Sequence, residues 1–428
     1  MSLPCFFTLS FLLFCICAQG VVPPSQTFNF VNEGEFGEYV VEYDANYRAL
    51  SVFSSPFQLC FYNTTPGAYT LALRMGTVRS ESLMRWVWEA NRGNPVGENA
   101  TFSLGANGNL VLANADGRVA WQSNTADKGV VGFRLLPNGN MVLYDSNGSF
   151  VWQSFDLPTD TLLVGQALRR KGPNKLVSRL SETENKNGAY SLVLERRGFA
   201  LYYTSKKSPR PMLYFDATDY LSLGKLDVLT FDSQPETEDA FAYEIMLKDT
   251  KLGGARILSR PKYNSTLTYL RLGIDGGLRA FTFYDKVDWG AWEETFTLFA
   301  RDNVEECQLP ERCGSFGLCE DSQCVACPSP NGLMGWSKSC APPKLTSCKP
   351  NDIKYFKLEG VEHFMSKYTR GSGPVKEEDC SRSCTSDCKC LGFFFNPTES
   401  RCWIAYELKT LTRVANSTNL GYIKAPAH

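Results

Sequence analysis

Polar and apolar residues alternate from Asn138 to Tyr144, which is the period of a β-strand with one buried face. The dipeptide Asn147-Gly148 follows and is typical of a hairpin turn. Short runs of this kind, broken by Gly, Asn and Pro, fill the chain from Thr27 to Asp160. No helical period competes with them, so this part of the chain is predicted to consist of strands.

The segment Phe133–Leu157 repeats an earlier segment, Phe102–Ala126, without a gap. Both copies contain Asn-Gly-Asn and Trp-Gln-Ser, and a fainter third copy ends at residues 88–91. Each unit alone is too small to bury its apolar face. Because each unit has one Trp at the same place, we expect three small sheets that pack their Trp side chains around a pseudo-threefold axis.

A second strand-rich region covers about residues 175–300, with a hairpin predicted around Asp275-Gly276. Its internal repeat is less regular than that of the first region. Trp289 and Trp292 are predicted to be core side chains rather than a sugar-binding platform.

The length of 428 residues is sufficient for several domains with hydrophobic cores. The chain has 44 basic and 45 acidic residues and no polybasic block, so nucleic acid and anionic membranes are not expected partners. Residues 1–20 contain an apolar run centred on Phe6–Cys17, followed by Ala-Gln-Gly, which predicts a signal peptide and a mature start at Val21. A signal anchor is the alternative, but the run is shorter than the ~20 residues that a bilayer requires. No second membrane span is expected, so the mature chain is predicted to be exported.

Of the 16 cysteines, three lie in the predicted signal peptide, Cys60 stands alone, and twelve lie near the C-terminus. In an exported protein these twelve are expected to form disulfides. They are Cys307, Cys313, Cys319, Cys324, Cys327, Cys340, Cys348, Cys380, Cys384, Cys388, Cys390 and Cys402. The crowding of six cysteines in residues 307–340 is the pattern of a small EGF-like module held by disulfides. Cys60 is either a buried thiol or an intermolecular bridge.

Residues 376–389 are predicted to form a helix with Cys380, Cys384 and Cys388 on one face. We expect disulfides to join this face to a sheet, whose cysteines are Cys348, Cys390 and Cys402.

Catalysis is not predicted, because the only histidines are His363 and the C-terminal His428. A Ser-His-Asp triad or a two-histidine zinc site would need the terminal residue. Close cysteine pairs such as Cys324 and Cys327 are an alternative zinc site, but export favours disulfides, and no metal or cofactor is expected. Carboxylate pairs for glycoside cleavage stay open, because their separation of ~5–9 Å is not visible in a sequence.

Acceptor sites for N-glycosylation occur where Asn-x-Ser/Thr lacks Pro. They are Asn63, Asn99, Asn147, Asn264 and Asn416.

The repeat offers a candidate sugar-binding face. On an extended strand residues 136, 138, 140, 142 and 144 point to one side, as do residues 105, 107, 109, 111 and 113 of the other copy. A polar face with one Val suits a sugar, which has hydroxyls and a small apolar patch. The alternative is that Asn-Gly-Asn serves only as a turn and Val142 only as core.

Several motifs resemble those of a known family. Trp88-Glu-Ala-Asn-Arg92, Trp152-Gln-Ser-Phe-Asp156 and Pro158-Thr-Asp-Thr-Leu-Leu163 resemble the bulb-type mannose-binding lectin domain of plants. The order of the regions is similar to that in S-locus glycoproteins and in the ectodomains of G-type lectin receptor kinases. The whole mature chain resembles the EP1-like secreted glycoproteins of plants, which share Phe30-Val-Asn-Glu-Gly34 and Trp86-Val-Trp-Glu-Ala-Asn-Arg-Gly-Asn-Pro95.

The resemblance implies a mainly β fold in four parts after the signal peptide at 1–20. These are a pseudo-threefold β-prism lectin domain at 21–165, a second β-prism-like domain at 166–302, a disulfide-rich EGF-like module at 303–345 and an α+β PAN/apple module at 346–428. The PAN/apple resemblance also implies three disulfides, which are Cys380–Cys402, Cys384–Cys390 and Cys348–Cys388.

The family's sugar site reads Gln-x-Asp-x-Asn-x-Val-x-Tyr. The resemblance transfers it to Asn138, Asn140, Val142 and Tyr144 in one copy and to Asn107, Asn109 and Val111 in the other. Leu136 replaces the Gln, and Asn138 replaces the Asp. Each loss should weaken binding by about 1–3 kcal/mol, whereas a millimolar complex has only about 4 kcal/mol in total. Free mannose is therefore predicted to bind weakly or not at all.

Two functional hypotheses follow from the resemblance, and neither is enzymatic. In the first, the chain is a glycoprotein of the cell wall or apoplast that binds wall glycans or glycoproteins through a partly degenerate mannose-type site. In the second, it is a protein-interaction or structural wall protein. Its PAN/apple and EGF-like modules then dock another exported protein, and the lectin domain is scaffold.

Overall fold

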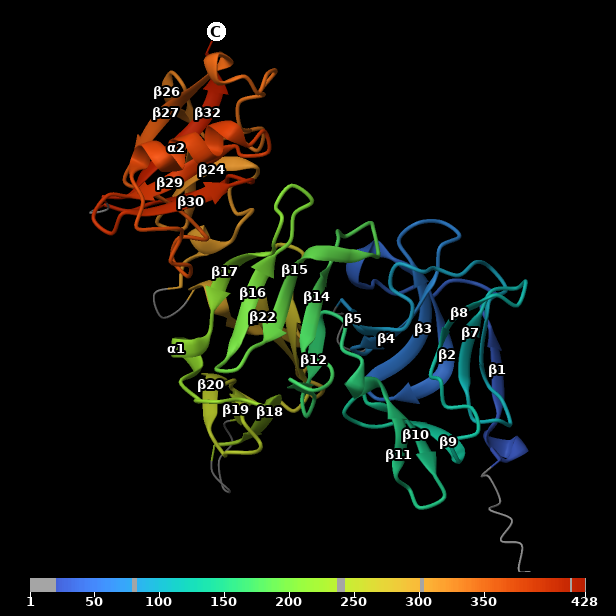
Figure 1. Cartoon of the computed structure of the whole chain (residues 1–428). Coiled ribbons are helices and arrows are strands. Elements are labelled where there is room, and N and C mark those ends of the chain that lie inside the picture. The colour runs from blue at the N-terminus through green and yellow to red at the C-terminus, as the bar shows by residue number, and fades with distance from the viewer. Residues whose placement is uncertain (1–20, 79–82, 237–242, 301–303, 416–417, 428) are drawn as a thin grey trace, which may run out of the picture.

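The computed structural model describes residues 21–78, 83–236, 243–300, 304–415 and 418–427. The predicted signal peptide, Asn416 and His428 lie outside these residues. The fold is mainly β, and Figure 1 shows an N-terminal β region beside a second β region, with a C-terminal region next to the second one. Among the described residues, no helix is long and apolar enough to cross a membrane.

The N-terminal region contains sheets in the orders β2-β3-β4-β5, β1-β6-β7-β8 and β11-β10-β9. Its strands are β1 (Phe28–Val31), β2 (Asn46–Ser54), β3 (Phe57–Asn63), β4 (Thr70–Met75), β5 (Arg85–Glu89), β6 (Thr101–Leu104), β7 (Leu110–Ala113), β8 (Val119–Gln122), β9 (Val130–Leu135), β10 (Met141–Asp145) and β11 (Phe150–Gln153). Each sheet contributes one Trp to a shared cluster. The rings of Trp88, Trp121 and Trp152 meet edge to face, with centroids 6.0, 6.4 and 5.8 Å apart. The predicted contact between the repeated Trp side chains is confirmed.

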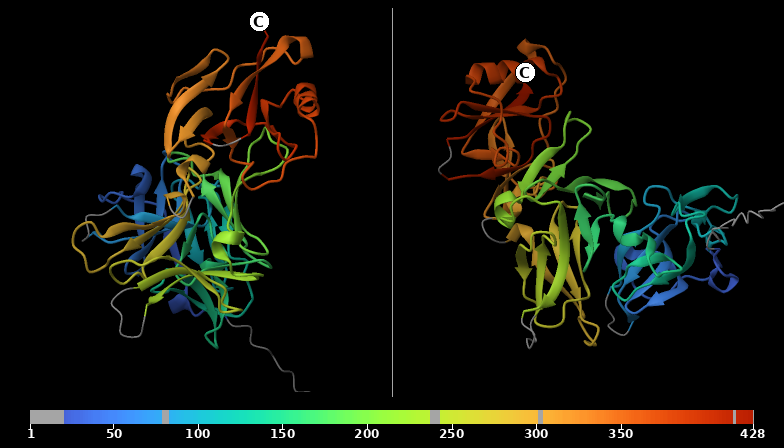
Figure 2. Two further views of the ribbon diagram at one scale, coloured as in Figure 1. Left: turned by 90° about the vertical axis from the view of Figure 1, so that its left-hand side faces the viewer. Right: turned by 60° about the horizontal axis from the view of Figure 1, so that its bottom comes forward.

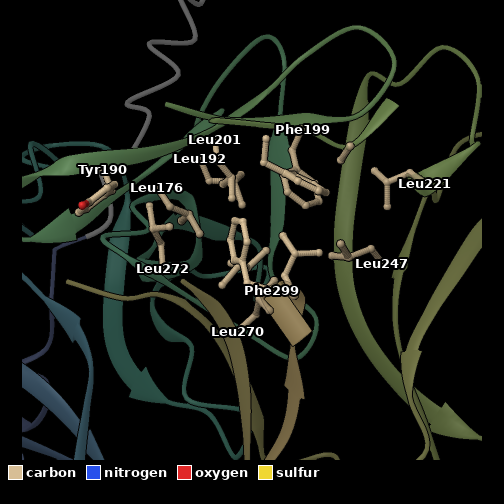
Figure 3. Packing of buried hydrophobic residues seen from close by; sticks show 14 of the residues in the cluster. Leu176, Tyr190, Leu192, Phe199, Leu201, Leu221, Leu247, Leu270, Leu272 and Phe299 are labelled. Carbon is tan, nitrogen blue, oxygen red and sulfur yellow. The ribbon is translucent and has the colours of Figure 1, made fainter. Parts of the chain in front are cut away.

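The second region contains three four-stranded sheets, in the orders β14-β15-β16-β17, β13-β18-β19-β20 and β12-β21-β22-β23. Its elements are β12 (Thr161–Leu163), β13 (Ala167–Arg169), β14 (Lys175–Arg179), β15 (Asn187–Leu194), β16 (Phe199–Tyr203), β17 (Met212–Asp216), α1 (Thr218–Leu221), β18 (Val228–Pro235), β19 (Tyr243–Lys248), β20 (Ala255–Ser259), β21 (Thr268–Leu272), β22 (Leu278–Phe283) and β23 (Trp292–Thr297). Figure 3 shows Leu192, Leu201, Leu270 and Phe299 pointing into one core between these sheets.

The sheet β12-β21-β22-β23 lies between the two β regions. Leu270 and Leu272 of β21 belong to the core of the second region, whereas Tyr269 belongs to the core of the N-terminal region. Because side chains alternate along a strand, Arg271 lies on the same face as Tyr269. Both faces of β21 are therefore buried, and the two β regions are joined by packing as well as by the chain.

The core prediction for the two tryptophans near β23 is half right. Trp292 is partly buried and packs against the N-terminal core. Trp289 is 71% exposed, so its prediction is wrong. It lies in the loop between β22 and β23, where the alternation of a strand no longer decides which side chains are buried.

The C-terminal region contains a five-stranded sheet, β26-β25-β24-β31-β28, and a four-stranded sheet, β27-β32-β29-β30. Its elements are β24 (Phe316–Glu320), β25 (Gln323–Ser329), β26 (Gly332–Gly335), β27 (Ile353–Glu359), β28 (Val361–His363), α2 (Glu377–Ser386), β29 (Gly392–Asn396), β30 (Arg401–Ala405), β31 (Lys409–Arg413) and β32 (Leu420–Pro426). Strand β24 pairs in parallel with β31, so one sheet crosses the boundary expected at residue 345.

All twelve expected cysteines form disulfides, which excludes the zinc alternative for them. The pairs in the first half are Cys307–Cys319, Cys313–Cys324 and Cys327–Cys340. The pairs in the second half are Cys348–Cys388, Cys380–Cys402 and Cys384–Cys390, which confirms the implied pairing.

The predicted helix is shorter than expected. Helix α2 ends at Ser386, so Cys388 does not lie on its face and that part of the prediction is wrong. The Asp387 carboxylate accepts the backbone N–H of Lys389 at 2.9 Å, a local bond that turns the chain out of the helix. Cys380 and Cys384 do lie buried on one face of the helix, as expected.

The C-terminal region docks on the second β region, and both views in Figure 2 place these two regions next to each other. The Tyr190 hydroxyl donates to one Glu311 oxygen at 2.8 Å, and the Lys409 ammonium group donates to the other at 2.5 Å. The rings of Phe215 and Tyr368 are 5.8 Å apart. These contacts fix the C-terminal region on the second β region.

Candidate functional site

The predicted sugar-binding residues lie on a turn and on the strand that follows it. Residues 136–140 are not extended, because the backbone N–H of Gly139 bonds to the Leu136 carbonyl at 2.9 Å. Gly139 has φ +84°, and a Cβ atom there would lie 2.7 Å from Leu163. The expectation that Leu136, Asn138 and Asn140 share one face of a strand is therefore wrong. For residues 138–140, the alternative that Asn-Gly-Asn serves only as a turn agrees better with the structure.

The side-chain amide of Asn140 is buried and bonded within the chain. Its nitrogen donates to the Gln153 side chain at 2.9 Å, and its oxygen accepts from the Ser154 hydroxyl and the Phe155 backbone N–H, both at 3.3 Å. A buried amide is expected to have such partners. These bonds tie the turn before β10 to the end of β11.

Asn109 repeats this arrangement in the other copy. Its nitrogen donates to Gln122 at 2.9 Å, and its oxygen accepts from the Ser123 hydroxyl at 3.1 Å and the Thr125 backbone N–H at 3.0 Å. Asn107, like Asn138, is exposed, and each side-chain oxygen accepts the backbone N–H two residues later at 3.1 Å. The repeated sequence thus encodes a repeated turn.

The strand half of the motif does present an outer face. Met141 and Leu143 belong to the core of the N-terminal region, so Val142 and Tyr144 point to the opposite side of the sheet. Val142 is buried between its cross-strand neighbours Arg134 and Gln153 rather than within that core. In the other copy Val111 is half-buried between Ser103 and Gln122.

Tyr144 is the aromatic member of this outer face. Its ring is half-buried, and the Arg134 guanidinium carbon lies 4.4 Å from the ring centroid. The sequence reasoning missed Arg134 and Gln153. The recurrence of Gln in both Trp-Gln-Ser motifs was the available signal for Gln153, whereas Arg134 has no counterpart in the motif.

The acceptor sites for glycosylation differ in exposure. Asn99, Asn147 and Asn264 are exposed. Asn63 is only 4% exposed at the end of β3, so a glycan there would require local displacement of its neighbours, and Asn63 stays a prediction.

The histidine and the free cysteine of the described residues are both buried, so neither side chain is accessible to a substrate. His363 is buried, and burial lowers its pKa to about 4. Its Nδ1 accepts the Met365 backbone N–H at 3.2 Å, so Nε2 carries the proton and donates to the Glu407 carbonyl at 2.9 Å. Cys60 is also fully buried, and burial raises the pKa of its thiol to about 12. Between the two explanations for Cys60, the structure favours the buried thiol.

Two family models match the chain. The model described as D-mannose binding lectin matches residues 85–182, and the S-locus glycoprotein domain matches residues 221–336. The first match includes β9 to β11 and the outer face around Tyr144. The second match extends from α1 to the disulfide-rich segment.

The chain is similar to several plant proteins over most of its length. It is 51% identical to EP1-like glycoprotein 4 of Arabidopsis thaliana over 99% of this chain and 97% of that protein. It is 56% identical to the epidermis-specific secreted glycoprotein EP1 of Daucus carota over 82% of this chain and 97% of that protein. A solved two-domain, fetuin-binding lectin of Scilla campanulata matches 60% of this chain at 15% identity, with a TM-score of 0.16.

Proposed function

Because the chain belongs to the family of EP1-like glycoproteins, we propose that it is a secreted, non-catalytic glycoprotein of the plant cell wall or apoplast that binds glycans. One observation carries the glycan-binding part. The lectin-type match covers the outer face of the sheet β11-β10-β9, where Tyr144, Val142, Arg134 and Gln153 lie side by side. An aromatic ring, a small apolar side chain and polar donors together suit a sugar, which has apolar C–H patches and a rim of hydroxyls.

Free mannose is not the ligand we expect at this face. The amides of Asn140 and Asn109 are already bonded within the chain, so neither can bind a sugar hydroxyl without losing bonds to its neighbours. Such an exchange costs about as much as it gains. We therefore propose an extended wall glycan, which contacts more than one shallow face and gains affinity by multivalency.

The parts of the chain have proposed roles that rest on the resemblance. We assign residues 21–165 to the lectin domain, residues 166–302 to a second β-prism-like domain, residues 303–345 to an EGF-like module and residues 346–428 to a PAN/apple module. The order of the first six disulfide-bonded cysteines, first to third, second to fourth and fifth to sixth, supports the EGF-like assignment. The two last modules are candidates for docking another exported protein.

A second function is favoured by the same buried amides. If Asn140 and Asn109 serve only to hold the turns, the lectin-type region is a scaffold and the protein acts through its C-terminal region. The role of the repeated residues in the turns then explains the sequence repeat without a sugar ligand.

A glycan array decides between the two functions. It compares the unchanged secreted protein with its Tyr144→Phe and Arg134→Ala variants. Both changes lie on the outer face and leave the buried amides intact. If this face binds glycans, the array signals should fall in both variants. The control is Tyr39→Phe, which changes an exposed tyrosine outside this face and should leave the signals unchanged. Absence of any signal, or equal signals from all four proteins, would support the scaffold function instead.

A further inference from the structure

A groove in the second β region is lined by three tyrosines and by one of the glycosylation sites. Its volume is about 880 Å³, and its lining includes Tyr243, Tyr263, Asn264, Leu267, Tyr284 and Val287. We call it the tyrosine groove. This volume is within the range of about 300–1,000 Å³ that ligand pockets occupy. We propose that Asn264 carries an N-linked glycan and that the first sugars of this glycan lie in the tyrosine groove.

The acceptor segment is held in a fixed conformation at the groove. The Asn264 side-chain oxygen accepts the Thr266 backbone N–H at 2.9 Å and the Thr266 hydroxyl at 2.7 Å. Between them, Ser265 is buried and bonded to the Ser233 hydroxyl at 2.7 Å. These bonds involve only the oxygen of the Asn264 amide. Its nitrogen, the atom that receives the sugar, has no hydrogen bond to the described residues.

The groove offers the surface that a sugar ring packs against. Tyr263 is 59% exposed, and its ring stands edge-on to that of Tyr284, with centroids 5.3 Å apart. The Tyr284 hydroxyl donates to Glu293 at 2.5 Å, which fixes the buried ring in place. The apolar face and acetamido methyl group of N-acetylglucosamine match such rings. Lys262 and Lys286 add exposed donors for its hydroxyls.

Attachment at Asn264 favours the chain's own glycan over a free one. A tethered sugar meets the groove at a high effective concentration, whereas a free oligosaccharide must compete from solution. The modification joins C1 of N-acetylglucosamine to the Asn264 amide nitrogen, which loses one proton. The bond from C1 to the diphosphate of a lipid-linked oligosaccharide donor breaks, and the lipid diphosphate leaves.

This proposal rests on export and N-glycosylation, but it does not require the lectin-type face to bind anything. A negative glycan array therefore leaves this proposal intact, and unprotected cleavage of the Asn264 glycan leaves the proposed glycan binding intact.

The test compares sites on one chain. The protein is secreted from cells that make only high-mannose glycans, and the folded protein is treated with an endoglycosidase that cleaves between the first two sugars. Site-resolved mass spectrometry then follows Asn264, with the exposed Asn99 and Asn147 as controls. We expect cleavage at Asn264 to be about tenfold slower than at the controls, and Tyr263→Ala to reduce this ratio to less than about twofold. Tyr39→Ala should leave the ratio unchanged.

A second measurement does not depend on glycan trimming. In the folded Asn264→Gln variant, nitration should modify Tyr263 faster than in the glycosylated protein, while nitration of Tyr39 stays the same. An unmodified Asn264, equal cleavage at all three sites, or equal nitration of Tyr263 in both proteins would overturn the proposal.

Discussion

The contact between the two β regions depends on a buried arginine, and replacing it is the most direct test of how they are joined. Arg271 of β21 reaches into the N-terminal region, where its guanidinium group bonds to Glu42 at 2.6 Å and to the Trp86 carbonyl. Its Nε donates to the Thr161 hydroxyl at 3.1 Å. The Arg271 and Glu42 side chains are only 8% and 10% exposed. Arg271→Met keeps an apolar side chain of similar length and leaves the Glu42 carboxylate buried without this partner.

Removal of one partner from a buried ion pair usually destabilises a protein by about 3–5 kcal/mol. Arg85 lies 3.4 Å from the same Glu42 oxygen and compensates part of the loss, so we expect the lower end of this range. The two β regions together comprise about residues 21–302, and an unfolding entropy of roughly 2.1 cal/mol/K per residue makes each kcal/mol lower their Tm by roughly 2 °C. Arg271→Met should therefore lower the Tm of the two β regions by roughly 5–6 °C in calorimetry.

The matched control is Arg279→Met on the neighbouring strand β22. Arg279 pairs with Asp275 at 2.6 Å, but these side chains are 28% and 45% exposed, and such pairs contribute at most about 1 kcal/mol. The double variant Glu42→Gln/Arg271→Met should regain part of the lost stability, because no buried carboxylate is left unpaired. The reasoning is refuted if Arg271→Met and Arg279→Met lower the Tm equally.

Three further results are expected. Asn140→Ala should destabilise the chain by about 1–3 kcal/mol in thermal unfolding, because it leaves buried polar groups without a hydrogen-bond partner. The control Asn138→Ala should destabilise it by only about 0.5–1.5 kcal/mol. Equal losses of stability would contradict the structural role of the Asn140 amide. The Cys60 thiol should not react with maleimide at about pH 8 until the chain is unfolded, and labelling of the folded chain would contradict its burial. The pKa of His363 is lowered to about 4 in the fold, so the C-terminal region should lose up to about 3 kcal/mol of stability as the pH falls from about 6.5 to about 4. Urea unfolding at both pH values checks this, and His363→Gln should remove most of the difference.

The parts of the fold that could be predicted from the sequence are those set by repetition and by covalent chemistry. The repeat predicts that Trp88, Trp121 and Trp152 meet, because equivalent positions in equivalent units face the same axis. The resemblance also gives the pairing of the last six cysteines, which the structure confirms. The sheet shared by the two β regions could not be predicted, since a buried strand such as β21 does not reveal which core each of its faces contacts.

The end of helix α2 shows a second limit of sequence patterns. Cys380, Cys384 and Cys388 recur at the helical period, and this period predicts a single face. One side-chain bond from Asp387 and the disulfide from Cys384 to Cys390 nevertheless require the chain to turn before Cys388. Periodicity reports where a helix is compatible with burial, whereas local bonds decide where it ends.

The candidate site shows why a motif that defines a fold is weak evidence for a ligand. Asn140 and Asn109 occupy equivalent places in the repeat, and both bind a Gln side chain and the backbone that follows it. The fold therefore requires these amides whether or not a sugar is bound. Tyr144 and Arg134 do not stabilise these turns. The Tyr144 side chain faces outward, and the Arg134 guanidinium group lies over the Tyr144 ring. If the outer face binds a glycan as proposed, substitutions at these two positions, rather than at the asparagines, should change its specificity without loss of the fold.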